Sequence, residues 1–205
     1  MGIKPSRHAL EAATSEFERH HGVMRTSEVL AAGIHRRTLY WMRDAGLLEA
    51  LSRGVYHLTS SELPEKPDVA AVVRRVPRAV VCLISALDIH ELGTQVPAEV
   101  QIALPRGVRA PRIDHPRVRV FHMDAPSLAA GVEERAWGGV TLRVFSVAKT
   151  VADCFKYRGS IGRDVAVEAL QDAVRGRRAS PGEIMEYAAI DRVQNVVRPY
   201  LEALL

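Results

Sequence analysis

A short segment in the first quarter of the chain combines side chains that are suited to binding a polyanion. Arg36 and Arg37 are adjacent, and Tyr40, Trp41 and Arg43 follow within two turns of a predicted helix. A guanidinium group can donate two parallel hydrogen bonds to a phosphate group or to the O6 and N7 atoms of guanine. Arginines interleaved with aromatic side chains therefore indicate contact with a nucleic acid rather than a merely solvated surface.

Residues 22–31 are expected to lead into this segment as a short strand followed by a helix. Thr26 or Ser27 is predicted to cap the helix, because a hydroxyl group accepts a hydrogen bond from the free amides at a helix start. Val29 and Leu30 are expected to bury one side of it. This pattern predicts the first helix of a helix-turn-helix.

A turn at Gly33 precedes the second helix, and His35 stands at the start of that helix. Glycine suits this turn because it readily adopts left-handed backbone angles. At about 100° per residue, Leu39 and Met42 fall on one side with Thr38 beside them. The opposite side collects Arg36, Arg37, Tyr40, Trp41 and Asp44. The N-terminal residues of a recognition helix reach base edges, so we expect the two arginines to contact bases.

A hairpin is predicted directly after this helix. Gly46 ends the helix, residues 47–51 and 55–58 form two strands, and Arg53 lies at the tip. Helix, turn, basic helix and hairpin is the order of a winged helix-turn-helix, in which the hairpin tip can contact a phosphate or enter the minor groove. The alternative is a winged helix that binds another protein and has a solvated basic side.

Composition places few limits on function. The chain has 205 residues, 47% of them hydrophobic, and a formal net charge of +4, which permits nucleic-acid binding without requiring it. It has no apolar run of about 18 residues and no signal-peptide pattern, so we expect a cytoplasmic protein without membrane contact. Cys82 and Cys154 are isolated in apolar runs and are expected to be buried and reduced.

The rest of the chain is predicted to mix helices and strands. Residues 59–67 are rich in turn formers, so we expect a boundary there, between a winged helix-turn-helix domain at residues 1–60 and a mixed α/β domain at residues 61–205. The predicted fold class is α+β. The expected strands are residues 99–104, 117–123, 132–137 and 140–145, with a hairpin turn at Gly138-Gly139; the expected helices are residues 67–76, 146–157, 162–175 and one that begins at Ser180-Pro181. Asp191 is expected to cap a last helix that Pro199 bends or interrupts.

A second basic patch is predicted in the connection between the first two of these strands. Its members are Arg106, Arg109, Arg112, Arg117 and Arg119, with Asp114 as the one acid among them. Such a patch can hold a further phosphate stretch or an RNA, or it can simply be a charged, solvated strand edge. The sequence leaves these alternatives open.

We expect no catalytic residues, metal or cofactor. Lys149 and Asp153 lie one turn apart in a predicted helix and are more simply a buried pair than a catalytic one. A nuclease of the Asp, Glu-x-Lys type would need a further carboxylate pattern that is missing after the predicted strands. The histidines have no metal-ligand spacing, and there is no glycine-rich phosphate loop or Gly-x-Ser-x-Gly motif.

The order of these motifs resembles the AbiEi antitoxin family of type IV toxin–antitoxin (abortive infection) systems. The resemblance rests on GIHRRTLYWMRDAGLLEALSRGVYHL, ISALDIHELGTQVPAEVQIALPRG, VFSVAKTVADCFKYRGSIGRDVAVEAL and the closing NVVRPYLEALL. It covers nearly the whole chain from about residue 20. Residues 61–205 would then be an AbiEi-like C-terminal antitoxin domain.

The resemblance implies a transcriptional autorepressor that binds inverted repeats of double-stranded DNA ahead of its own operon, which requires a homodimer or cooperative binding. It also implies a functional pairing with a nucleotidyltransferase-like toxin without a required stable complex. An antidote that binds its toxin directly is the alternative. With Trp41 and Arg43 added, the candidate DNA-binding residues are His35, Arg36, Arg37, Thr38, Tyr40, Trp41, Arg43 and Arg53.

Overall fold

The computed structural model describes residues 4–137 and 140–204 and divides the chain into two compact units. The N-terminal unit consists of Met1–Pro77, Pro111–Arg117 and Ala136–Leu142. The C-terminal unit consists of Arg78–Ala110, Val118–Arg135 and Arg143–Leu205. The hairpin turn predicted at Gly138-Gly139 lies outside the described residues.

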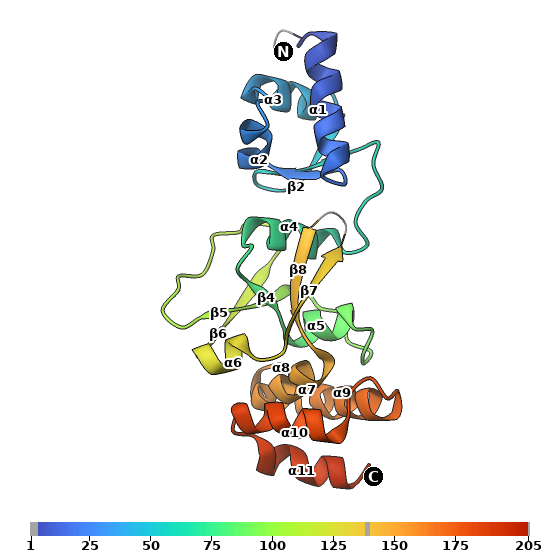
Figure 1. Ribbon diagram of the computed structural model, residues 1–205, viewed down its shortest axis with the longest axis vertical. Helices are drawn as coiled ribbons and strands as arrows, with labels where there is room; N and C mark the ends of the chain where they lie inside the picture. The colour runs from blue at the N-terminus through green and yellow to red at the C-terminus, as the bar shows by residue number, and fades with distance from the viewer. Residues whose placement is uncertain (1–3, 138–139, 205) are drawn as a thin grey trace. The chain divides into compact units, whose positions relative to one another are not determined.

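The N-terminal unit has the element order of a winged helix. Its elements are α1 (Arg7–Arg19), β1 (Val23–Arg25), α2 (Thr26–Ala31), α3 (Arg36–Asp44), β2 (Leu48–Ser52), β3 (Val55–Leu58) and α4 (Pro67–Arg75). The three strands form an antiparallel sheet in the order β1-β3-β2 (Figure 1). The predicted fold class, α+β with an N-terminal winged helix-turn-helix, is confirmed.

Apolar side chains from the three helices and the sheet make one core in this unit. Phe17 of α1, Leu39 and Met42 of α3, and Leu48 of β2 are buried together. The spacing of Leu39 and Met42 places both on the same side of α3, as the sequence predicts. This core fixes which side of α3 remains exposed.

Two details of α2 differ from the sequence-based predictions. The predicted hydroxyl cap is wrong: Arg25 is the N-cap residue, and its backbone amide donates to the Glu28 carboxylate at 2.7 Å. Thr26 instead donates its hydroxyl and its amide to the Gly54 carbonyl, at 3.3 and 2.8 Å, because it stands beside the hairpin turn. Val29 is buried as predicted, but Leu30 is 37% exposed and was wrongly placed in the core.

The N-terminal unit extends past the boundary that we expected after residue 60. Helix α4 packs against the sheet of this unit, and its residue Arg74 is only 8% exposed. The Arg74 guanidinium donates to the Glu28 carboxylate at 3.0 Å and to the His20 carbonyl at 3.3 Å. Burial lowers the pKa of Arg74, against the opposing effect of Glu28. One buried arginine thus links α4 to α2 and to the end of α1.

The C-terminal unit consists of a mixed sheet and a group of helices. Its elements are β4 (Val80–Val81), α5 (Leu83–Ile89), β5 (Val100–Pro105), β6 (Val118–Met123), α6 (Ala125–Ala129), β7 (Val132–Trp137), β8 (Val140–Phe145), α7 (Val147–Lys156), α8 (Arg158–Ile161), α9 (Arg163–Arg175), α10 (Pro181–Ile190) and α11 (Gln194–Glu202). The strand order is β6-β5-β4-β8-β7. Helices α7 to α11 gather at one end of this sheet (Figure 1). The ends of β7 and β8 that face the turn are assigned to the N-terminal unit.

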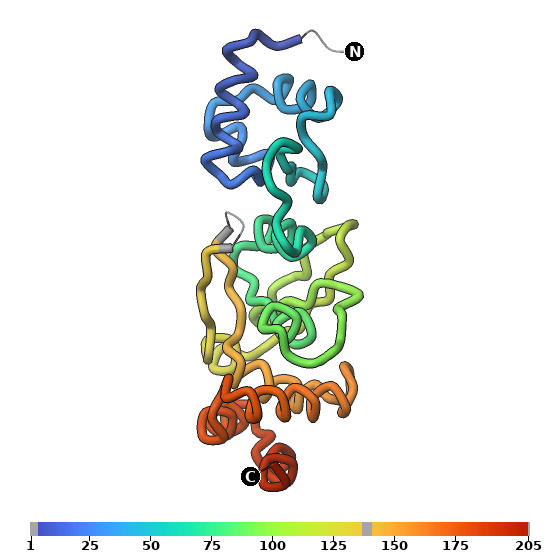
Figure 2. Tube along the Cα trace, turned by 90° about the vertical axis from the view of Figure 1, so that its right-hand side faces the viewer, coloured from blue at the N-terminus to red at the C-terminus, as the bar shows by residue number. Residues whose placement is uncertain are grey.

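Strands β5 and β6 are parallel, with Val100 opposite Val118 and Pro105 opposite Met123. A parallel pair needs a long crossover, and a helix is the usual solution. Here residues 106–117 make the crossover without any helix, as Figure 2 shows in yellow-green. This irregular connection carries most of the predicted second basic patch.

The interior of the C-terminal unit confirms the prediction for the cysteines, since Cys82 and Cys154 are both buried and unpaired. The prediction for Asp191 is wrong: it ends α10, and α11 begins after Val193 without a side-chain cap. Helix α11 also continues through Pro199 to Glu202, so this proline does not interrupt it. Among the described residues, no helix has the length and apolar character needed to cross a membrane.

Candidate nucleic-acid interface

Helix α3 has well-defined ends. The His35 imidazole Nδ1 accepts a hydrogen bond from the Arg37 amide at 3.1 Å, which satisfies one of the free donors at the helix start. At the other end, the Gly46 amide donates to the Arg43 carbonyl at 3.0 Å, and Gly46 has a φ of +74°. Left-handed backbone angles favour glycine, so the chain turns sharply into β2 at this residue.

The N-terminal end of α3 presents cationic side chains to solvent. Arg36 and Arg37 are exposed, on the side away from buried Leu39 and Met42. The partial positive charge of the helix dipole at this end adds to their charge. The side of α3 predicted to contact DNA is therefore accessible within this unit.

Two of the candidate DNA-binding residues do not belong to the exposed side. Thr38 is only 7% exposed and lies with the core residues of α3. Trp41 is half-buried and packs against the core cluster that contains Leu39. The buried surface of α3 is therefore wider than the strip defined by Leu39 and Met42, and a DNA contact by Thr38 or Trp41 stays a prediction.

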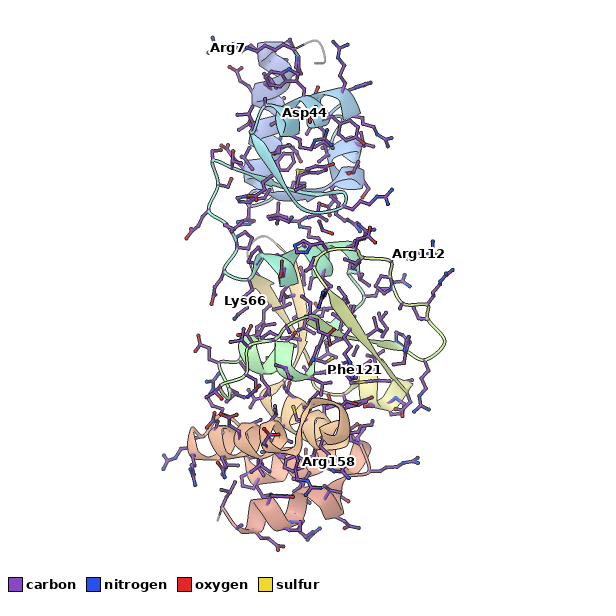
Figure 3. The ribbon with its side chains drawn as sticks, turned by 180° about the vertical axis from the view of Figure 1, so that it is seen from behind. Arg7, Asp44, Lys66, Arg112, Phe121 and Arg158 are labelled. Carbon is purple, nitrogen blue, oxygen red and sulfur yellow. The ribbon has the colours of Figure 1, made fainter. Side chains whose placement is uncertain are left out.

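The C-terminal half of α3 has its charges paired. The Arg43 guanidinium forms an ion pair with Asp44 at 2.6 Å and stacks over the Tyr40 ring, 5.1 Å from its centroid. The hydrogen bond that Arg43 donates to Asp44 raises the pKa of Arg43. Asp44 is labelled in Figure 3 at the end of this helix. Arg43 therefore brings less net positive charge to the surface than Arg36, as expected from its acidic neighbour.

The hairpin that corresponds to the wing is short. Strand β2 has an irregularity between Ala50 and Ser52, and the turn contains Arg53 and Gly54, with a φ of +79° at Gly54. Arg53 is exposed at the tip, as the sequence predicts. Its carbonyl accepts a hydrogen bond from the Arg75 guanidinium. Sequence reasoning missed Arg75, because nothing in its spacing links the end of α4 to this turn.

The predicted second basic patch does not form a single patch within one unit. Residues Arg112 and Arg117 belong to the N-terminal unit, whereas Arg106, Arg109 and Arg119 belong to the C-terminal unit. Arg119 lies within β6, where it is 3.7 Å from the Glu99 carboxylate and 5.0 Å from the centroid of the Phe121 ring. Arg106 is 3.9 Å from the Asp124 carboxylate. The arginines of this region therefore differ in their surroundings.

The pair Lys149 and Asp153 is buried, as predicted. The Lys149 ammonium lies 2.5 Å from Asp153, 3.2 Å from Asp191 and 4.7 Å from the centroid of the Phe145 ring. Asp191 also accepts hydrogen bonds from Ser127 at 2.7 Å and from Lys156 at 2.8 Å. This network ties α6, α7 and the end of α10 together.

The two carboxylates of the network differ in pKa. Burial raises the pKa of Asp153 to about 8, although Lys149 opposes the shift. Burial also acts to raise the pKa of Asp191, but Lys149 and the hydrogen bonds around it outweigh burial and keep this pKa below its ordinary value. Lys149, Asp153 and Asp191 have no exposed side-chain surface. Their arrangement therefore fits a structural role, in which they join neighbouring helices, better than contact with a bound substrate.

Among the residues that the structure describes, no group of three histidine, cysteine or acidic side chains lies close enough to hold a metal ion. A pocket of about 400 Å³ in the N-terminal unit is lined by Glu18, His21 and Glu65, among other residues. The carboxylates of Glu18 and Glu65 are unsuited to binding nucleic-acid phosphates. The accessible arginines of α3 and of the hairpin are therefore the best candidates for a functional surface.

Comparison with known proteins gives this surface a context. Residues 11–59 match the family model described as transcriptional regulator, AbiEi antitoxin. This match covers α2, α3, the hairpin and most of α1. The predicted resemblance to the AbiEi antitoxin family is thereby confirmed over the helix-turn-helix and hairpin, and it supports a role as an antitoxin or transcription regulator. No curated protein matches the sequence.

A solved structure is similar over almost the entire chain. The crystal structure of the RV2827C protein from Mycobacterium tuberculosis superposes with a TM-score of 0.58, covering 97% of this chain and 82% of that one. The two sequences are 14% identical, so this likeness shows a shared fold alone. The similarity thus extends to the fold of both units and is not limited to residues 11–59.

Proposed function

We propose that this chain is a DNA-binding transcriptional autorepressor and the antitoxin of a type IV toxin–antitoxin system, acting in the cytoplasm. The single observation that carries the proposal is the side of α3 that bears Arg36 and Arg37, because it is exposed while the opposite side is packed in the core. The match of residues 11–59 to AbiEi regulators supports the same conclusion.

The proposed DNA-binding residues follow from exposure and charge. Arg36 and Arg37 contact base edges in the major groove, since arginine matches the two acceptors of guanine. His35 and Tyr40 are also exposed on α3 and contribute contacts next to the two arginines. Arg43, which is paired with Asp44, helps to orient the helix on the DNA. Arg53 at the hairpin tip contacts a phosphate or the minor groove.

The proposed target is a pair of inverted repeats upstream of the operon that encodes the chain. A palindromic site is matched by two copies of the protein, so the chain binds as a homodimer or cooperatively. The proposed partner in the system is a nucleotidyltransferase-like toxin, which the antitoxin counteracts without a required stable complex. The C-terminal unit, residues 78–110, 118–135 and 143–205, supplies the antitoxin function.

DNase footprinting of the upstream region tests the DNA-binding proposal. We expect protection of two half-sites related by a dyad, and loss of repression by the Arg36→Ala variant in a reporter strain. A full-length protein that protects no DNA, and that instead retains the neighbouring gene product in a pull-down, would show that the winged helix serves protein contacts.

A further inference from the structure

The connection between β5 and β6 returns to the hairpin of the N-terminal unit. Residues 111–117, which we name the tethered loop, are held there by side chains that donate hydrogen bonds to backbone carbonyl groups of the loop. The Ser52 hydroxyl donates to the His115 carbonyl at 2.6 Å, and the Arg75 guanidinium donates to the Arg112 carbonyl at 3.0 Å. Ser52 is only 5% exposed, so this anchor is protected from water.

Arg75 connects the tethered loop to the hairpin turn. Its guanidinium donates one hydrogen bond to the Arg112 carbonyl and another to the Arg53 carbonyl. Both acceptors are neutral, so neither cancels the charge of Arg75. The same side chain therefore brings the backbones of Arg53 and Arg112 together.

The side chains of this region are available to an anionic partner. Arg53, Arg112 and Arg117 are exposed, and none of them forms an ion pair with any described residue. Figure 3 labels Arg112 on the outer side of the long connection. Asp114 is the one acid in the tethered loop. Since like charges repel, three exposed guanidinium groups with a single carboxylate in the loop are expected where a polyanion supplies further counter-charges.

We propose that the tethered loop is an accessory arm of the DNA interface, in which Arg112 and Arg117 contact the phosphate backbone beside Arg53. The proposal rests on the DNA-binding function proposed above. The loop has no regular secondary structure and is anchored through backbone carbonyl groups, so the exposed guanidinium groups of Arg112 and Arg117 remain available to phosphates. The arm compensates for the short hairpin by adding sequence-independent affinity.

Fluorescence anisotropy of the full chain tests this proposal, with one duplex from the upstream region and one scrambled duplex of equal length. The Arg112→Ala/Arg117→Ala variant should raise Kd for both duplexes roughly tenfold and reduce the slope of log K against log salt by about 2, at about 0.9 per lost phosphate contact. The ratio of the two affinities should stay unchanged. The Arg112→Lys/Arg117→Lys variant should keep most of the salt slope.

The Arg163→Ala/Arg198→Ala variant is the matched control, because it removes the same charge from exposed positions of the C-terminal unit. If the tethered-loop variant has the Kd and salt slope of this control, the accessory arm is excluded. The proposed function still stands in that case, provided that the wild type prefers the upstream duplex and Arg36→Ala weakens this preference. A wild type that binds neither duplex would overturn both proposals. Melting temperatures of all variants verify folding.

Discussion

The exposed surface of α3 and the hairpin in one unit, and the buried network of the other, treat cationic side chains in opposite ways. In the N-terminal unit, Arg36 and Arg53 are exposed and form no ion pair with any described residue. In the C-terminal unit, Lys149 has no exposed side-chain surface and lies against Asp153 and Asp191. A charge left in water stays available to an anionic ligand, whereas a buried charge must be neutralised within the fold. The comparison therefore separates binding residues from structural ones.

The difference also explains why total charge is a weak guide to function. A net charge of +4 on 205 residues is modest, and several cations are already paired inside the fold, such as Arg74 with Glu28. The capacity to bind an anionic ligand depends instead on where exposed guanidinium groups lie on the surface. If the comparison is correct, substitutions in the C-terminal network change stability, and substitutions on α3 and the hairpin change DNA affinity.

The largest expected effect is on stability, in the Asp191→Asn variant. Removing this carboxylate leaves Lys149 and Lys156 with less compensating charge, and breaking a buried pair costs about 3–5 kcal/mol of the free energy of unfolding. Urea denaturation measures the loss. DNA affinity per folded molecule should be unchanged. A stable variant with impaired DNA binding would reverse the roles that we assign to the two units.

The next largest effect is on DNA affinity, in the Arg36→Ala and Arg37→Ala variants. Each should cost about 1–3 kcal/mol of binding free energy and relax the preference at one base pair. The midpoint of urea denaturation should not move, because both side chains are exposed. Arg43→Ala is the matched control on the same helix, and we expect a smaller loss since its charge is already paired with Asp44. Equal losses in all three variants would argue against a role for Arg36 and Arg37 as base readers.

A smaller effect on affinity is expected from Arg53→Ala. Loss of one phosphate contact should weaken binding to all sequences alike and lower the salt slope by about 1. Titrations at several salt concentrations measure this slope. A change in base preference with an unchanged slope would instead place Arg53 in a groove as a base reader.

The smallest effect is expected from Asp153→Asn. Because burial raises the pKa of Asp153 to about 8, this carboxyl is largely protonated at neutral pH, and an amide resembles it. We expect a loss below about 1 kcal/mol at pH 7.

The pH dependence of this variant gives a second readout. The pKa of Asp153 is higher in the folded state than in the unfolded state, so the folded protein binds one more proton between these two pKa values. The free energy of unfolding therefore falls as the pH rises from about 4 through 8. The Asn variant lacks this contribution. Its deficit relative to the wild type should therefore shrink between pH 6 and pH 9 in urea denaturation. A deficit that stays constant over this range would mean that Asp153 is already ionised in the folded protein.

Local sequence patterns predicted much of the fold. The spacing of Leu39 and Met42 placed the buried side of α3, and hydroxyl caps such as Ser146 and Ser180 marked where helices begin. These features depend on neighbouring residues in the chain, which is why a sequence reveals them. The burial of Lys149 beside Asp153 was also predictable, because residues four apart on a helix are neighbours.

Features that depend on distant residues were not predictable. Thr26 is directed to the Gly54 carbonyl rather than to its own helix start, and Asp191 is directed to two lysines rather than to α11. The tethered loop is the clearest case, since the hydrogen bond from Ser52 to His115 joins residues 63 positions apart. In the candidate site, periodicity placed Arg36 and Arg37 on the exposed side and Thr38 beside Leu39 and Met42, but the partial burial of Trp41 depended on packing by the rest of the unit.

The measurement that tests the central claim most directly is the ratio of affinities for the upstream duplex and a scrambled duplex, compared between the wild type and the Arg36→Ala/Arg37→Ala variant. Our account predicts a clear preference of the wild type for the upstream duplex and a ratio near one for the variant, with unchanged thermal stability. A variant that retains the wild-type ratio would contradict it.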